Sequence, residues 1–121
     1  MKCQIFISYR ADESLQFARQ LYSYLTNLKY SVFFDEKSTR SGFFNEAIYN
    51  AIDECEDFIL LMTPGTFVKR KEDWVYQELA RALKKEKNII PIALYGVERF
   101  PENLDSDIKD VKYCHIIKLD K

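Results

Sequence analysis

The stretch FILLM at residues 58–62 is the longest uninterrupted apolar run of the chain, and Thr63, Pro64 and Gly65 follow it directly. A short apolar run that ends in a turn is typical of a strand in a parallel sheet, because helices then cover both of its faces. A helix that crosses a bilayer needs about 20 apolar residues, so the run is far too short for one. It therefore predicts a central strand of an α/β sheet and no membrane partner.

Segments with the pattern of strands and helices alternate on both sides of this run. We predict further strands at residues 4–8, 31–34, 88–94 and 113–119, helices at 12–28, 44–55 and 74–86, and weak helical character at 103–109. Connections of a dozen or more residues join parallel strands. The expected fold class is therefore α/β, a flavodoxin-like doubly wound five-stranded parallel sheet in the order 2-1-3-4-5 with helices on both faces, in a single domain spanning residues 1–121.

The composition excludes several kinds of function. The 121 residues carry 18 Lys and Arg against 19 Asp and Glu, and this balance argues against a nucleic-acid partner. Three glycines cannot form a Gly-rich phosphate loop, and one His with three scattered Cys offers no zinc site, so no metal and no cofactor are expected. Unpaired cysteine spacing and the absence of an apolar leader after Met1 predict a cytoplasmic location.

The ligand site of such a sheet is expected at the carboxyl ends of its strands, where the winding direction reverses. Ser8, Tyr9 and Arg10 lie at the end of the first strand, at this point. In the helix at 74–86, Trp74, Glu78 and Arg81 fall within one narrow sector, and the adjoining sector should face the sheet. Helix geometry leaves two interpretations of Glu78 open: a partly desolvated functional carboxylate, or a surface glutamate paired with Arg81 or Lys85.

Five segments, in order, together resemble the TIR domain family. They are IFISYR at 5–10, SVFFD at 31–35 with the loop that reaches Gly42, FILLMTPG at 58–65, DWVYQEL at 73–79 and NIIPI at 88–92. The resemblance is closest to NAD-cleaving TIR domains, those of bacterial proteins and of the animal axon-degeneration NADase. It implies that Glu78 is the catalytic residue, and with the expected geometry it suggests as substrate-binding residues Ser8, Tyr9, Arg10, Arg40, Phe44 and Trp74.

The resemblance implies an NAD⁺ nucleosidase that is activated by self-association, in defence or cell-death signalling such as anti-phage immunity. NAD⁺ is then the substrate, and the products are nicotinamide and either ADP-ribose or a cyclic ADP-ribose. Two alternatives remain open: a non-enzymatic TIR adaptor that acts through homotypic contacts, and an enzyme similar to nucleoside deoxyribosyltransferases.

The chain also departs from the pattern of the family. Arg40 stands where the axon-degeneration enzyme has a glutamate, and Ala11 stands where it has a second basic residue. No final helix is predicted after the fifth strand. We therefore expect either a domain without that helix or a piece of a longer protein with a fused or associated sensor module.

Overall fold

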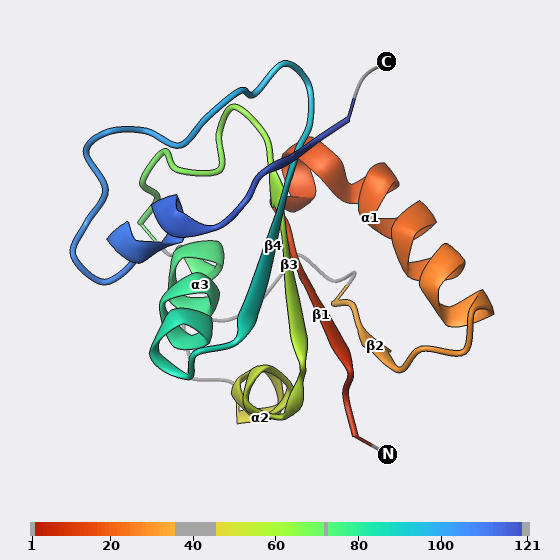
Figure 1. Ribbon diagram of the computed structural model, residues 1–121. Coiled ribbons are helices and arrows are strands. Elements are labelled where there is room, and N and C mark those ends of the chain that lie inside the picture. The colour runs from red at the N-terminus through yellow and green to blue at the C-terminus, as the bar shows by residue number, and fades with distance from the viewer. Residues whose placement is uncertain (1, 36–45, 72, 120–121) are drawn as a thin grey trace.

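The strands and helices alternate along the chain as the sequence predicts (Figure 1). The computed structural model describes residues 2–35, 46–71 and 73–119. The elements are β1 (Ile5–Ser8), α1 (Ala11–Asn27), β2 (Val32–Phe33), α2 (Glu46–Glu54), β3 (Asp57–Met62), α3 (Trp74–Lys84), β4 (Asn88–Ala93), the 3-10 helix η1 (Lys109–Tyr113) and β5 (Ile117–Lys118).

All the strand pairs of the sheet are parallel, and the strand order is β2-β1-β3-β4-β5, which confirms the predicted topology. Strand β3 lies at the centre, where Phe58 pairs with Phe6 of β1 on one side and with Ile89 of β4 on the other. The side chains of residues 58–62 are buried throughout. This explains why the run is continuously apolar rather than alternating.

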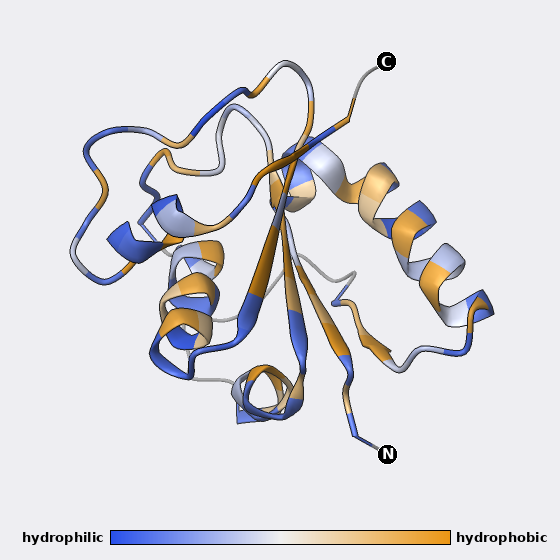
Figure 2. Ribbon diagram, viewed as in Figure 1, coloured by the Kyte–Doolittle hydropathy of each residue, from blue (hydrophilic) through white to orange (hydrophobic). Residues whose placement is uncertain are grey.

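Helices cover both faces of the sheet, as expected of a doubly wound fold (Figure 1). Helix α1 packs over the cluster of Ile5, Ile7 and Leu61, whereas α2, α3 and η1 pack over the cluster that holds Phe6, Phe58 and the other alternate strand residues. The central strands β3 and β4 are hydrophilic where they begin, at Asp57 and Asn88, and mainly apolar beyond that point (Figure 2). The two cores are thus separated by the sheet, with Ile5 and Ile7 of β1 in one core and Phe6 in the other.

The predicted helical character at 103–109 is wrong. Residues 106–108 form a turn, and the 3-10 helix comes later, over Lys109–Tyr113. This segment is rich in Asp, Asn and Ser, whose short polar side chains compete with helical backbone hydrogen bonds. Ile108 and Val111 are buried against the core and anchor the segment without an α-helix.

Pro91 lies inside β4, opposite Leu60 of β3. A proline within a sheet needs an edge that no neighbouring strand uses. Strand β5 pairs only with Ile92 and Ala93, so in the described part of the chain no strand flanks the outer edge of β4 at Pro91. This local edge accounts for the irregular residue.

Within the described ranges, no helix combines the length and the apolar character needed to cross a membrane. The same residues contain no cluster of three or more His, Cys, Asp or Glu side chains that could bind a metal ion.

Candidate functional site

The Glu78 carboxylate lies buried at the carboxyl end of β1. Helix α3 begins at Trp74, and Glu78 follows one turn later with a relative exposure of only 2%. The hydroxyl of Ser8, the last residue of β1, donates a hydrogen bond of 2.8 Å to Oε1 of Glu78. Two residues that are 70 positions apart in the sequence therefore meet at the end of the sheet where a ligand is expected.

Glu78 is more deeply buried than helix geometry alone indicates. Helix α2 packs beside α3, and the Glu78 side chain is almost fully buried. Arg81, one of the two surface partners considered for Glu78, instead forms a two-pronged pair with Asp53 of α2, at 2.9 Å and 2.7 Å. The surface interpretation of Glu78 is therefore wrong for this structure. A buried carboxylate costs free energy, and such groups are common at functional sites.

The ion pair between Arg81 and Asp53 changes the pKa of Asp53. The hydrogen bond from the Arg81 guanidinium lowers the pKa of the Asp53 carboxyl below its ordinary value. Both side chains are about 30% exposed, so this is a surface contact between helices. The positive charge of Arg81 is directed to α2, on the flank of α3 away from the cavity described below.

Tyr9 lies on the opposite face of the sheet from Ser8. Its ring packs in the cluster beneath α1, 5.3 Å from the ring centre of Phe34, and its hydroxyl donates a 2.6 Å hydrogen bond to the carbonyl of Asp35. Neighbouring residues along a strand point to opposite faces, and this alternation places the two side chains apart. The structure therefore does not bring Tyr9 to Glu78, and its contact with a substrate stays a prediction.

Arg10 follows the end of β1 and is buried, with a relative exposure of 4%. Its guanidinium binds the carboxylate of Asp73 at 2.8 Å and 3.1 Å, and it donates a 2.7 Å hydrogen bond to the carbonyl of Thr66. Asp73 is also the N-cap of α3, because its side chain accepts a 2.9 Å hydrogen bond from the backbone N–H of Tyr76. Sequence reasoning missed this role of Asp73, although an aspartate directly before a helical pattern is a known start signal.

Comparison with known proteins identifies the family of this chain. A family model described as the TIR domain matches residues 5–119, which is nearly the whole chain. The chain belongs to the TIR domain family. This match confirms the resemblance to TIR domains that the sequence motifs indicate.

Several animal proteins contain a segment similar to this TIR domain. The NAD(+) hydrolase sarm1 of Drosophila melanogaster is 33% identical over 84% of the chain, SARM1 of Danio rerio is 30% identical over 94%, and tir-1 of Caenorhabditis elegans is 34% identical over 89%. The aligned segment makes up 8%, 17% and 11% of these proteins. The TIR domain thus spans a small part of each relative.

Solved structures show the same fold at lower identity. The TIR domain of the Toll-related receptor TRR-2 from Hydra magnipapillata superposes with a TM-score of 0.63 and 21% identity, covering 94% of this chain and 82% of that one. A metazoan TIR-STING receptor from C. gigas gives a TM-score of 0.68 at 21% identity, covering 95% of this chain and 34% of that one.

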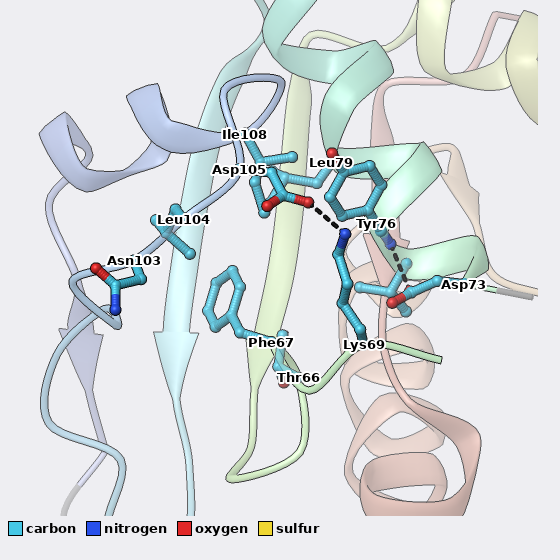
Figure 3. Close-up of a pocket in the computed structure, with 11 residues that line it drawn as sticks. Thr66, Phe67, Lys69, Asp73, Tyr76, Leu79, Asn103, Leu104, Asp105 and Ile108 are labelled. Atoms are coloured by element: carbon cyan, nitrogen blue, oxygen red, sulfur yellow. Dashed lines mark hydrogen bonds and ion pairs between the residues drawn. The ribbon is translucent and has the colours of Figure 1, made fainter. Parts of the chain in front are cut away.

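A cavity of about 140 Å³ lies on another flank of α3 in this TIR domain (Figure 3). Its walls come from the segment after β3, from α3 and from the segment after β4, and a 2.7 Å ion pair between Lys69 and Asp105 joins the first and the last of these. Neither Ser8 nor Glu78 lines it. The cavity and the buried carboxylate are therefore separate features on two sides of one helix.

The remaining predicted substrate-binding residues are Trp74, Arg40 and Phe44. Trp74 is half-buried at the first position of α3, one turn before Glu78, and its role as a wall of the substrate site stays a prediction. Arg40 and Phe44 lie outside the described residues.

Proposed function

We propose that this TIR domain is an NAD⁺ nucleosidase that cleaves the bond between nicotinamide and ribose, with Glu78 as its catalytic carboxylate. The observation that carries the proposal is the buried Glu78 carboxylate, bonded to Ser8 at the carboxyl end of β1. The animal relatives are named NAD(+) hydrolases, which supports the choice of NAD⁺ as the substrate.

One carboxylate is sufficient for this reaction. Nicotinamide in NAD⁺ is a cationic leaving group: when its bond to C1′ of the ribose breaks, the electron pair returns to the ring nitrogen and the ring leaves neutral. No general acid has to protonate it. Positive charge develops at C1′, as in other glycosidic cleavages, and a nearby carboxylate stabilises that charge.

Burial strengthens the effect of this carboxylate, because its interaction with the developing charge is screened less than it would be in water. The Ser8 hydroxyl holds Oε1 of Glu78 in one orientation, so the group need not reorganise as the bond breaks. Trp74, one turn away on the same helix, would then flank a planar ring of the substrate. Capture of the C1′ cation by water would give ADP-ribose and a proton, and capture by a nitrogen of the adenine would give a cyclic product.

Activation by self-association is part of the proposal. The structural neighbours include the TIR domains of the activated Roq1 resistosome, which superpose with a TM-score of 0.67 over 79% of this chain and 59% of that one. The TIR domain would then act in immune or cell-death signalling, as one module of a larger assembly.

The test is to incubate purified protein with NAD⁺ and a crowding agent and to measure free nicotinamide and the ribosyl products by chromatography. We expect Glu78→Gln and Glu78→Ala to lower the rate by about a hundredfold to a thousandfold or more, since the charge acts on the transition state. Glu102→Gln is the matched control, because Glu102 is exposed in the segment after β4. Circular dichroism checks that each variant is folded.

If Glu78→Gln releases nicotinamide at the parental rate, the catalytic assignment is wrong. If the assembled parent protein releases none, the adaptor alternative is favoured instead.

A further inference from the structure

We propose that Arg10 and Asp73 form a clasp that positions the first turn of α3, and that Arg10 thereby orients Glu78 instead of binding the diphosphate of NAD⁺. The catalytic half of this proposal rests on the proposed function. Its structural half can be measured in the absence of NAD⁺.

The clasp is a two-pronged ion pair. Nη1 of Arg10 lies 2.8 Å from Oδ1 of Asp73, and Nη2 donates a 3.1 Å hydrogen bond to Oδ2. Such parallel contacts between guanidinium and carboxylate fix both distance and orientation. The side chains are only 4% and 13% exposed, so water competes little for this pair.

The same carboxylate starts α3. Oδ1 of Asp73 accepts the backbone N–H of Tyr76 at 2.9 Å, so one oxygen serves both the ion pair and the helix cap. The N-cap of α3 is therefore attached to the end of β1, and the helix cannot shift along its axis without breaking the pair.

Arg10 also holds the segment that leads into α3. Nη2 donates to the carbonyl of Thr66 at 2.7 Å and to that of Val68 at 3.4 Å. At the same time the backbone carbonyl of Arg10 accepts the N–H groups of Glu13 and Ser14 in the first turn of α1. One residue thus joins the end of β1, the start of α1 and the start of α3.

The clasp works together with the Ser8 contact. Ser8 binds Glu78, and Arg10, two residues later, binds Asp73, five residues before Glu78 on α3. Two contacts at different points along one helix set its rotation as well as its position. Without the clasp, Trp74 and the first turn would move, and the Glu78 carboxylate would lose its fixed place against Ser8.

A diphosphate contact would compete with this arrangement. Both terminal nitrogens of the Arg10 guanidinium already bind protein oxygens. Its third nitrogen, Nε, has no hydrogen-bond partner among the described residues. A substrate phosphate that took the terminal nitrogens would have to displace Asp73 from Arg10.

The experiment compares Arg10→Gln, Asp73→Asn and the double variant. Asparagine is a good N-cap, so Asp73→Asn keeps an acceptor for Tyr76 and removes only the charge of the clasp. Trp74 is the one tryptophan of the chain and directly follows Asp73, so its fluorescence and its quenching by acrylamide report on the first turn. We expect both single variants to change this signal alike, and the double variant to add little.

In the NAD⁺ assay we expect each single variant to lower kcat by about 10- to 100-fold with KM changed much less, as for a misplaced catalytic group. The control is Arg81→Gln, which removes an arginine–aspartate pair from the other end of α3 and should leave the Trp74 signal as it is. If Arg10→Gln proves unfolded by circular dichroism, Asp73→Asn carries the test.

The proposal is overturned if Arg10→Gln raises KM at unchanged kcat while Asp73→Asn behaves like the parent, because Arg10 would then bind the substrate. It is also overturned if Trp74 reports no change in either single variant. A coupled change at Trp74 in a protein that releases no nicotinamide at all would support the clasp and contradict the proposed function alone.

Discussion

Gly65→Ala is a sharp test of how the segment after β3 is held. The N–H of Gly65 donates a 3.0 Å hydrogen bond to Oε1 of Glu13 on α1, and the hydroxyl of Thr63 donates to the same oxygen. A Cβ at Gly65 would overlap Oε2 of Glu13 and lie 2.8 Å from its Cδ. The backbone is no obstacle, since Gly96 is the glycine with a positive φ among the described residues. The substitution therefore acts by displacing the Glu13 carboxylate.

The size of the effect follows from these contacts. A hydrogen bond to a charged group contributes about 1.5–3 kcal/mol, and the loss falls at the low end here because Glu13, at 28% exposure, can turn to water. Replacing glycine by alanine in an allowed conformation stabilises by about 0.4–1 kcal/mol through the unfolded chain. The net loss in the free energy of unfolding should be about 1–2 kcal/mol.

The sign should reverse when Glu13 is absent. In a Glu13→Ala background the three atoms that lie nearest the new methyl group are removed, so Gly65→Ala should stabilise by about 0.4–1 kcal/mol. Urea unfolding of the four proteins of this cycle, followed by circular dichroism, measures both values. If Gly65→Ala destabilises equally in both backgrounds, the conflict with Glu13 is not the cause and the reasoning fails.

Three further predictions concern the core and the surface. Burial raises the pKa of the Cys55 thiol to about 12, so iodoacetamide at pH 7.5 should leave Cys55 unmodified until the protein is unfolded, as mass spectrometry can show. The hydrogen bond from Arg81 lowers the pKa of Asp53. The ion pair therefore stabilises the folded protein at pH values above the ordinary carboxyl pKa, and this stabilisation is lost as pH falls. Arg81→Gln should therefore cost less than about 1 kcal/mol at pH 7, and its difference from the parent should shrink as pH falls below the ordinary carboxyl pKa in denaturant titrations. Leu79→Ala should cost about 2–5 kcal/mol in the same assay, because Leu79 is 1% exposed and its loss enlarges the cavity beside α3.

The fold was accessible from the sequence because its signals are local. The run at 58–62 and the alternating segments predict a parallel sheet and its order, and the structure confirms both. The ends of the elements are less accessible. β5 covers only Ile117–Lys118 instead of 113–119, since Tyr113 belongs to η1, and such limits depend on packing rather than on propensity.

The site was accessible only in part, because its contacts are distant in sequence. Helix periodicity singles out Glu78 but places it at the border of the buried face, because the full burial of its side chain depends on tertiary packing. The bond between Ser8 and Glu78 joins residues 70 positions apart, which no pattern in one sequence reveals. The partners of Arg10 were hidden for another reason: two of them are backbone carbonyls, which carry no sequence signal.

The Ser8-Tyr9-Arg10 motif shows how one strand end can serve three purposes. The alternation of side chains sends Ser8 towards α3 and Tyr9 into the core beneath α1. Arg10, after the strand, turns again to the α3 side and reaches Asp73. Tyr9 packs in the core on the face of the sheet opposite the Glu78 carboxylate. Its packing fixes the backbone between Ser8 and Arg10. Ser8 and Arg10 therefore both face α3, while Tyr9 between them packs in the other core. This alternation lets one strand end hold a buried glutamate in a single orientation.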